Sequence, residues 1–223
     1  KIENGFYSAL NQKVHCYARY NRPYLECFEY FVSESKLNDC RADGDVDTVK
    51  PLVIANDYNA AINSLVTCQV VEHELRTLKS FFVKTPRKLK DVVEDWCAYY
   101  HYHTNRNVIF YYDSTAVYDT PLDAMTFADT VVEVLRKNGW NVSAEYIGQP
   151  VKHHLKHNYL DLALKGDPNY LFPSFNSDNN EYLLIAMEQT GIKVGRNGFE
   201  KDKSAEKDAD CPDSPDEYKT HIT

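Results

Sequence analysis

At residues 52–59 the sequence reads Leu52-Val53-Ile54-Ala55-Asn56-Asp57-Tyr58-Asn59, an apolar run that ends on an aspartate. Aliphatic residues bounded by Pro51 and a polar cluster are typical of a buried strand whose end reaches the surface. The same arrangement recurs where Val108-Ile109-Phe110-Tyr111-Tyr112 is followed by Asp113 and Ser114. We therefore predict two strands of one sheet that each end in a carboxylate and together could hold a divalent metal ion.

The remaining segments predict a mixed α/β sheet around these two strands. Short polar breaks separate three strands, 52–58, 62–71 and 75–84, for which consecutive antiparallel pairing is expected. The elements predicted after them are a helix from Pro86 to near His103, a strand at 107–113, a helix from Pro121 to before Gly139, a strand over 140–146, and helices over about 152–165 and 179–190. This order predicts an antiparallel meander followed by parallel strands that join through right-handed helical crossovers, with helices on both faces. The first and fourth strands are then neighbours, so that Asp57 faces Asp113.

Two regions outside this pattern are predicted to be less regular. Residues 1–50 are expected to form an N-terminal arm or linker with one added strand at 24–32, in which the acidic segment 43–47 is a solvated turn rather than a calcium loop. Residues 51–223 are expected to form the α/β domain, with 193–217 as a mobile charged loop. Because the sequence begins with Lys1, we expect an excised domain or processed fragment.

Composition restricts the classes of partner. With 25 Lys and Arg against 33 Asp and Glu, the net charge of −8 has the wrong sign for a protein that grips nucleic acid over its whole surface. Any DNA contact must therefore be local, with metal ions offsetting the acidic site. The six cysteines contain no Cys-x-x-Cys pair, so we expect reduced thiols in or near the core. No apolar stretch approaches the roughly 20 residues of a membrane span, and no signal-peptide pattern opens the chain, which predicts a soluble intracellular protein.

Two carboxylates on neighbouring strands suit phosphodiester hydrolysis by two metal ions, Mg²⁺ or Mn²⁺, about 4 Å apart. Asp57 and Asp113 are the predicted catalytic metal ligands, and Asp216 is the candidate for a third, with Asp213 and Glu217 close to it in sequence. The candidates for DNA contact come from the predicted helix 152–165 and from the charged loop: Lys152, His153, Lys156, Arg196, Lys201 and Lys203.

The meander with Asp57 in its first strand, followed by Tyr111-Tyr112-Asp113-Ser114, resembles the ribonuclease-H-like nuclease domain of tailed-phage terminase large subunits over roughly residues 50–223. In that family a final helix opens on a pattern like Thr/Ser-His-x-x-Asp-Ala, whose Asp is the third metal ligand. The last four residues, 220–223, look like the first four positions of that pattern, and the chain stops where the Asp would follow. The third ligand of the family is therefore expected to lie just past Thr223.

The resemblance implies a virus-encoded endonuclease that acts in the host cytoplasm and cuts concatemeric double-stranded DNA. It also implies an upstream ATPase domain, a small terminase and a portal as partners. Because the sequence has no Gly-x-x-x-x-Gly-Lys-Ser/Thr loop, this piece could not power packaging itself.

Two alternatives remain open at this point. The aspartates could be strand-end turn caps in a non-catalytic module that docks on a portal or capsid protein. Within the same fold, the chain could instead be another nuclease, such as a Holliday-junction resolvase or a transposase-like enzyme. Indifference to Mg²⁺ and Mn²⁺ would favour the docking module.

Overall fold

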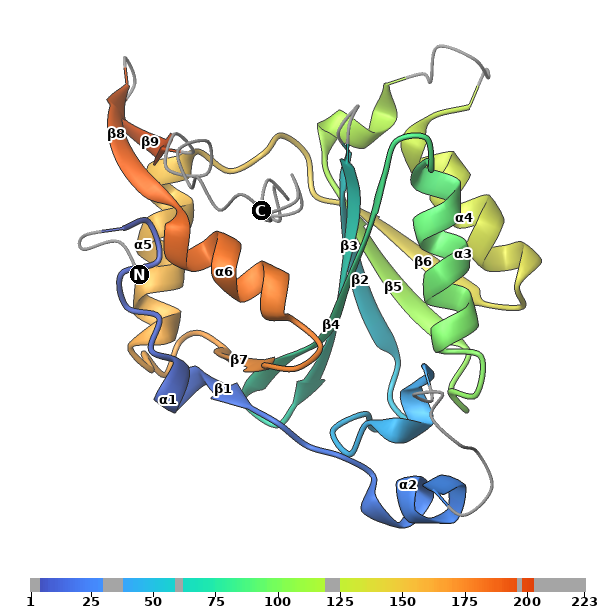
Figure 1. Cartoon of the computed structure of the whole chain (residues 1–223). Coiled ribbons are helices and arrows are strands. Elements are labelled where there is room, and N and C mark those ends of the chain that lie inside the picture. The colour runs from blue at the N-terminus through green and yellow to red at the C-terminus, as the bar shows by residue number, and fades with distance from the viewer. Residues whose placement is uncertain (1–4, 30–37, 59–61, 119–124, 196–197, 203–223) are drawn as a thin grey trace.

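The computed structural model of the chain describes residues 5–29, 38–58, 62–118, 125–195 and 198–202. Within these ranges seven strands form one mixed sheet. In sheet order they are β1 (Cys16–Tyr17), β7 (Phe172–Asn176), β4 (Glu74–Lys84), β3 (Ile62–Val71), β2 (Leu52–Tyr58), β5 (Asn107–Tyr112) and β6 (Asn141–Tyr146). Helices cover both faces (Figure 1): α3 (Leu89–Tyr99) and α4 (Phe127–Lys137) on one, α5 (His153–Leu164) and α6 (Glu181–Gln189) on the other.

The central strands pair as predicted. β2, β3 and β4 are antiparallel in succession. β5 is parallel to β2 and β6 is parallel to β5, so the later strands extend the sheet on the side of β2 that the meander leaves open. This arrangement confirms the predicted ribonuclease-H-like mixed sheet, including its helices on both faces.

Helices α3 and α4 begin later than predicted. The Lys88 backbone N–H donates to the Asp91 carboxylate at 2.6 Å, and α3 starts after this cap rather than at Pro86. In α4 the Thr126 hydroxyl accepts from the Asp129 N–H at 3.0 Å, so this helix does not start at 121. Capping side chains set both starts, because they satisfy the free N–H groups of the first turn. The proline at 121 lies outside the described residues, whereas the helices predicted near 152–165 and 179–190 are confirmed.

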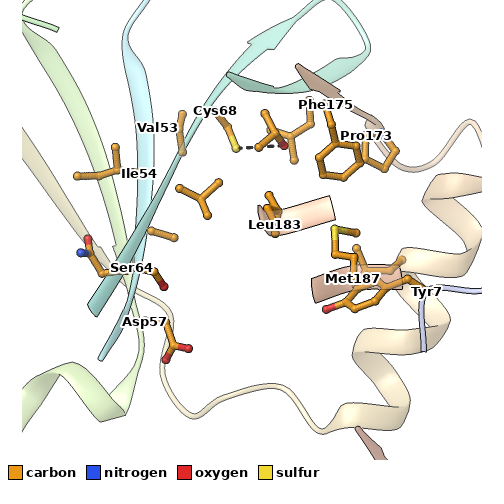
Figure 2. A pocket seen from close by; sticks show the side chains of 16 residues that line it. Tyr7, Val53, Ile54, Asp57, Ser64, Cys68, Pro173, Phe175, Leu183 and Met187 are labelled. Atoms are coloured by element: carbon orange, nitrogen blue, oxygen red, sulfur yellow. Dashed lines mark hydrogen bonds between the residues drawn. The ribbon is translucent and has the colours of Figure 1, made fainter. Parts of the chain in front are cut away.

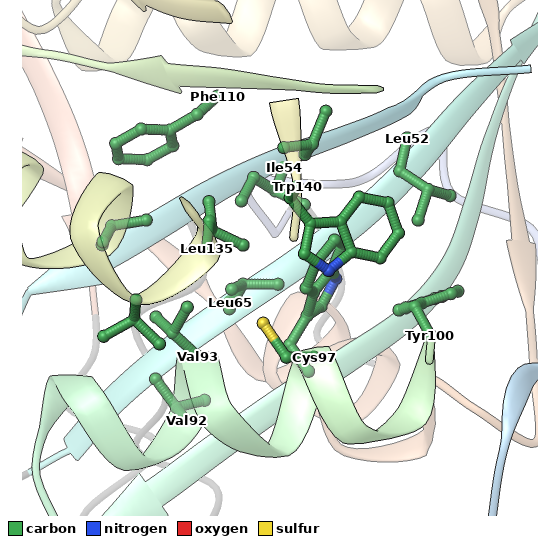
Figure 3. Close-up of a cluster of buried hydrophobic side chains, with 14 of the residues drawn as sticks. Leu52, Ile54, Leu65, Val92, Val93, Cys97, Tyr100, Phe110, Leu135 and Trp140 are labelled. Atoms are coloured by element: carbon green, nitrogen blue, oxygen red, sulfur yellow. The ribbon is translucent and has the colours of Figure 1, made fainter. Parts of the chain in front are cut away.

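The main hydrophobic core lies between the sheet and helices α3 and α4 (Figure 3). Trp96 is fully buried there, its ring centroid 4.7 Å from that of Trp140, and its indole N–H donates to the Thr67 hydroxyl at 2.9 Å. The buried aliphatic residues that the strands contribute are Leu52, Ile54, Leu65, Leu78, Val83 and Val108. A second, smaller core joins the N-terminal arm to α5, α6 and β7.

The structure corrects the prediction for the N-terminal region. Residues 22–29 form helix α2 (Arg22–Glu29), where a strand was expected. The side chain of Asn21 accepts from the Tyr24 N–H at 3.4 Å and Pro23 lies in the first turn, which together are a helix-start signal. The added strand is β1, which pairs parallel with β7, and β7 in turn pairs parallel with β4. Neither β1 nor β7 was predicted.

Part of the expected charged loop is a regular hairpin. Strands β8 (Gly191–Gly195) and β9 (Gly198–Asp202) pair antiparallel with each other, apart from the main sheet. The prediction of a mobile loop is therefore wrong for the described part of 193–202. Residues 203–217 lie outside the described part of the chain.

The expectations from composition are met in part. No helix in the described ranges is long and apolar enough to cross a membrane. The described cysteines are free thiols, as expected: Cys16, Cys27, Cys40, Cys68 and Cys97. Cys27 differs from the expectation because it is exposed, and Cys211 lies outside the described residues.

The acidic segment 43–47 is not a solvated turn. Asp45 is 4% exposed, and its carboxylate accepts from the Tyr17 hydroxyl at 2.8 Å and the Asn176 amide at 3.1 Å. Asp43 accepts from the Tyr99 hydroxyl at 2.6 Å. Burial raises the pKa of both carboxyls above the usual value. These bonds join the N-terminal arm and β7 to helix α3 across the end of the sheet.

We predict that Asp45→Asn stabilises the protein at neutral pH. Because burial raises the folded-state pKa of Asp45 above its unfolded value, the carboxyl favours folding most at low pH, and this contribution is lost as pH rises through the folded pKa. The amide keeps an oxygen acceptor without the buried charge. The melting temperature at pH 7 should rise by roughly 2 to 4 °C, the effect of about 1 kcal/mol in a domain of this size.

This gain should shrink as the pH falls, because the raised folded-state pKa lets wild-type Asp45 take up a proton and lose its buried charge. Thermal melts monitored by circular dichroism between pH 4 and pH 8 would measure it. The exposed Asp178→Asn is the matched control and should change little at any pH. A melting temperature for Asp45→Asn that lies below wild type at pH 7 would contradict this account of the Asp45 charge.

Candidate active site

The two predicted ligands lie at neighbouring strand ends. In the β2–β5 pair Ala55 is opposite Tyr111, so Asp57 and Asp113, two residues further along, continue the same register. Alternation along a strand then directs both carboxylates to the same face of the sheet. Both are partly buried. Burial raises the pKa of the adjacent Tyr58 phenol, and the negative charges of Asp113 and Asp57 raise it further, so both carboxylates act on one ring. The structure therefore brings together the pair that the sequence predicted.

Asp113 also caps a turn. One carboxylate oxygen, Oδ1, accepts from the Thr115 backbone N–H at 2.8 Å and from the Thr115 hydroxyl at 2.6 Å, at the start of the 3₁₀ helix Ser114–Val117. The turn-cap interpretation is thus correct for this oxygen. The other oxygen makes no hydrogen bond to a residue that the structure describes. Because a carboxylate has several acceptor positions, the cap holds Asp113 in place and leaves one oxygen for a ligand.

A cavity of about 250 Å³ opens beside Asp57, between β2–β4 and the helices α5 and α6. Its lining is mostly apolar and includes Val53, Phe175, Leu183 and Met187. Figure 2 shows Asp57 at one end of this group of side chains, with the residues of α6 and β7 across from the strands. The carboxylate therefore lies where an apolar cleft meets the polar end of the sheet.

Tyr7 of the N-terminal arm and Leu160 of α5 line the cavity across from the strands, and β9 is attached to both of these segments. Three polar residues of these segments, Tyr7, Lys156 and Lys201, are called the opposite wall below. Tyr7 lines the same cavity as Asp57, and its hydroxyl accepts from the Lys201 ammonium at 2.8 Å. Burial and the charge of Lys201 lower the pKa of Lys156, while the charges of Asp113 and Asp57 raise it. Lys156 is therefore close enough to sense both carboxylates.

The predicted DNA-contact residues differ in how accessible the structure leaves them. Lys152 is exposed and Lys156 is half-buried near the aspartates. His153 accepts from the Lys201 N–H at 3.2 Å and so helps to attach β9 to α5. The ammonium of Lys201 is 4.9 Å from the centre of the Phe6 ring, and its residue is 7% exposed, which does not favour a DNA contact. Three further predicted site residues lie outside the described part of the chain: Arg196, Lys203 and Asp216.

Sequence reasoning did not find the opposite wall as a unit. Its members come from positions 7, 156 and 201, and only the folding of the arm and hairpin against α5 brings them together. The spacing of Leu155, Tyr159 and Leu162 suggests an apolar side for α5, but it does not indicate the wall, because these side chains are 37%, 47% and 38% exposed.

The carboxylate oxygens of Asp57 and Asp113 fit one magnesium or manganese ion, but two carboxylates are too few for a pair of ions. Mg²⁺ commonly binds one or two carboxylates and completes its shell with water and phosphate oxygens. Asp57 and Asp113 could supply the carboxylates. Among the described residues there is no group of three or more His, Cys, Asp or Glu side chains that could hold a metal. A second ion would therefore need a carboxylate from elsewhere.

The fold and the paired aspartates define a ribonuclease-H-like α/β domain with an acidic site at its strand ends. No family model matches the sequence, and no curated protein does. Solved structures do match. A large terminase from a thermophilic bacteriophage, called the longer terminase below, shares 12% identity with a TM-score of 0.54, and the match covers 90% of this chain and 41% of that one. The structure of a large terminase from the same phage in complex with ATP-gamma-S shares 11% identity with a TM-score of 0.53, and the match covers 91% of this chain and 42% of that one.

The large terminase nuclease of thermophilic phage G20c matches 89% of this chain and 88% of that one, with 12% identity and a TM-score of 0.47. The match to the longer terminase, with its TM-score of 0.54, shows that this chain shares the fold of a part of that protein, of which it spans about 41%. At these identities the likeness establishes the fold, and function must be argued from the site.

We predict that Mn²⁺ stabilises the protein through Asp57 and Asp113. A ligand present at about 100 times its dissociation constant should stabilise the folded state by about 2.7 kcal/mol, which a thermal shift assay would detect. Asp57→Asn and Asp113→Asn should each remove most of this shift. They should also raise or preserve stability in EDTA, because two neighbouring carboxylates repel each other without a cation.

The control is Glu133→Gln, an exposed carboxylate on α4 that pairs with Lys137. It should keep the full Mn²⁺ shift. If Asp57→Asn and Asp113→Asn keep that shift as well, the metal binds elsewhere.

Proposed function

We propose that this chain is a metal-dependent DNA endonuclease, equivalent to the nuclease part of a phage large terminase. The observation that carries the proposal is the in-register placement of Asp57 and Asp113 at adjacent strand ends of a ribonuclease-H-like sheet. The fold shared with the longer terminase supports it.

In this proposal the substrate is concatemeric double-stranded DNA, and the carboxylates hold two divalent ions, Mg²⁺ or Mn²⁺. Bound ions would activate the attacking water and stabilise the leaving oxygen. Asp57 and Asp113 orient the ions, and the Thr115 cap keeps Asp113 from turning away. Asp216, or a residue beyond Thr223, is proposed as the third carboxylate. With a net charge of −8, the protein would contact DNA mainly at this site.

The proposed partners follow from the same comparison. This chain covers 41% of the longer terminase, which was also solved with ATP-gamma-S. We propose an ATPase domain, a small terminase and a portal as partners, with the virus-encoded protein acting in the host cytoplasm. These proposals depend on the nuclease assignment and would fail with it.

A second function is favoured by one observation. Helix α5 exposes the side chains of Leu155, Tyr159 and Leu162, which belong to neither hydrophobic core of the described residues. Such an exposed apolar group could bind the surface of another protein. If the aspartates are turn caps alone, the chain would be a docking module for a portal or capsid protein. Such a module would bind its partner in EDTA as well as in Mg²⁺.

Cleavage of supercoiled plasmid tests the nuclease directly. Wild type should nick or linearise the plasmid in Mn²⁺ or Mg²⁺ and not in EDTA. Asp57→Ala and Asp113→Ala should each reduce the rate by at least about 100-fold, since loss of a ligand removes transition-state stabilisation that no other group replaces. A version extended past Thr223 should cut faster if a third ligand lies there. Glu133→Gln is the control and should cut like wild type.

Absence of cleavage by every version, together with no Mn²⁺-dependent thermal shift, would contradict the nuclease and leave the docking module. Cleavage that survives both aspartate substitutions would also contradict the proposed site, because it would point to a contaminating enzyme or to another centre.

A further inference from the structure

One face of helix α5 is attached both to β9 and to the N-terminal arm. His153 accepts from the backbone of Lys201 at 3.2 Å, and the His157 ring N–H donates to the Phe6 carbonyl at 2.7 Å. Leu160, one turn further, lines the cavity that Asp57 also lines. Residues three and four apart share a helix face, so Lys156 lies on this same face. The position of Lys156 is therefore set by its helix neighbours: His153 is hydrogen-bonded to β9, His157 is hydrogen-bonded to the arm, and Leu160 lines the cavity.

The segment that leads from β6 into α5 is held beside Asp113 at its first residues. The Ser114 backbone N–H donates to the Gly148 carbonyl at 2.9 Å, and the Ser114 hydroxyl donates to the Gln149 side chain at 3.0 Å. The segment that leads from β6 into α5 thus runs along the turn that carries Asp113. The chain then continues to α5, and the charges of Asp113 and Asp57 raise the pKa of Lys156 against the larger, lowering effect of burial.

Lys156 has no polar partner in the described part of the chain. It is half-buried, and it makes no hydrogen bond or ion pair to a residue that the structure describes. Lys165, at the other end of the same helix, differs because it pairs with Asp161 at 2.6 Å. A partly buried ammonium without an acceptor is costly, and an anion in the gap would remove this cost. The acidic pair alone would repel a phosphate, whereas a cation across from it would attract one.

We infer that Lys156 is a substrate-contacting residue that donates to a non-bridging oxygen of the DNA phosphate held between it and the aspartates. The inference rests on the proposed function and extends it with a residue on the opposite wall. A lysine suits this role as a compact charge on a flexible stem, and the phosphate oxygens are strong acceptors. In the hydrolysis itself Lys156 keeps its proton, and it stabilises the charge that develops on the phosphoryl oxygens.

The test compares wild type with Lys156→Ala, Lys156→Arg and the control Lys165→Ala. Lys156→Ala should lower the cleavage rate at saturating DNA by about 10- to 100-fold, which is the range for loss of one charge-stabilising donor. It should retain the Mn²⁺ thermal shift, because the aspartates are unchanged. Lys156→Arg should recover part of the rate, and Lys165→Ala should match wild type in rate.

A second measurement uses DNA affinity in Ca²⁺, with a short duplex as the probe and no cleavage required. The slope of log affinity against log salt should fall by about 0.9 for Lys156→Ala, as expected for one lost phosphate contact, and should not change for Lys165→Ala. A structural role for Lys156 would instead lower the melting temperature and the Mn²⁺ shift together, without rescue by arginine.

The possible failures are distinct. If wild type cuts DNA and Lys156→Ala cuts equally well with an unchanged salt slope, the inference about Lys156 is wrong and the nuclease stands. If wild type binds Mn²⁺ but neither binds nor cuts DNA, the proposed function fails, and the inference fails with it.

Discussion

The parallel pairing of β2 with β5 is the constraint on which the candidate site depends. Neighbouring strands lie about 4.8 Å apart, so two carboxylates in the same register are close enough to repel each other strongly in a partly buried setting. The alternate residues of both strands, among them Ile54 and Phe110, are buried against α3 and α4, and this burial prevents the register from slipping. The hydrophobic core on one face of the sheet therefore fixes the acidic pair on the other. A fold that maintains such an electrostatic cost is well suited to hold cations.

The part of the fold that could be predicted from sequence is the part with long, regular patterns. The meander and the strand at 107–112 follow from apolar runs with clear polar breaks. Prediction failed where the decisive contact is distant or brief. β1 has two residues, and β7, which contains Pro173 and Ser174, gains its strand character by pairing with β4 on one side and β1 on the other. The helix starts were assigned to prolines, although nearby caps at 88 and 126 decided them.

The same distinction applies to the site. The positions of Asp57 and Asp113 follow from topology, since strand order alone makes them neighbours. The burial of Lys201 could not be foreseen, because it depends on Tyr7 and Phe6, almost two hundred residues away in the chain. Asp45 shows the same limitation. Its acidic neighbours suggest a surface turn, yet partners on β1 and β7 surround it.

The two walls of the site belong to different hydrophobic cores. The aspartates lie at the ends of strands that pack in the main core with Trp96, whereas Lys156 and Lys201 lie on α5 and β9, which pack against the smaller core around Phe6 and Leu164. Cooperative units of a protein open with separate free energies, and the smaller unit, which covers less apolar surface, opens first. The acidic half of the site should thus outlast the basic half as the protein is destabilised, so that affinity for metal and affinity for an anion are lost at different temperatures.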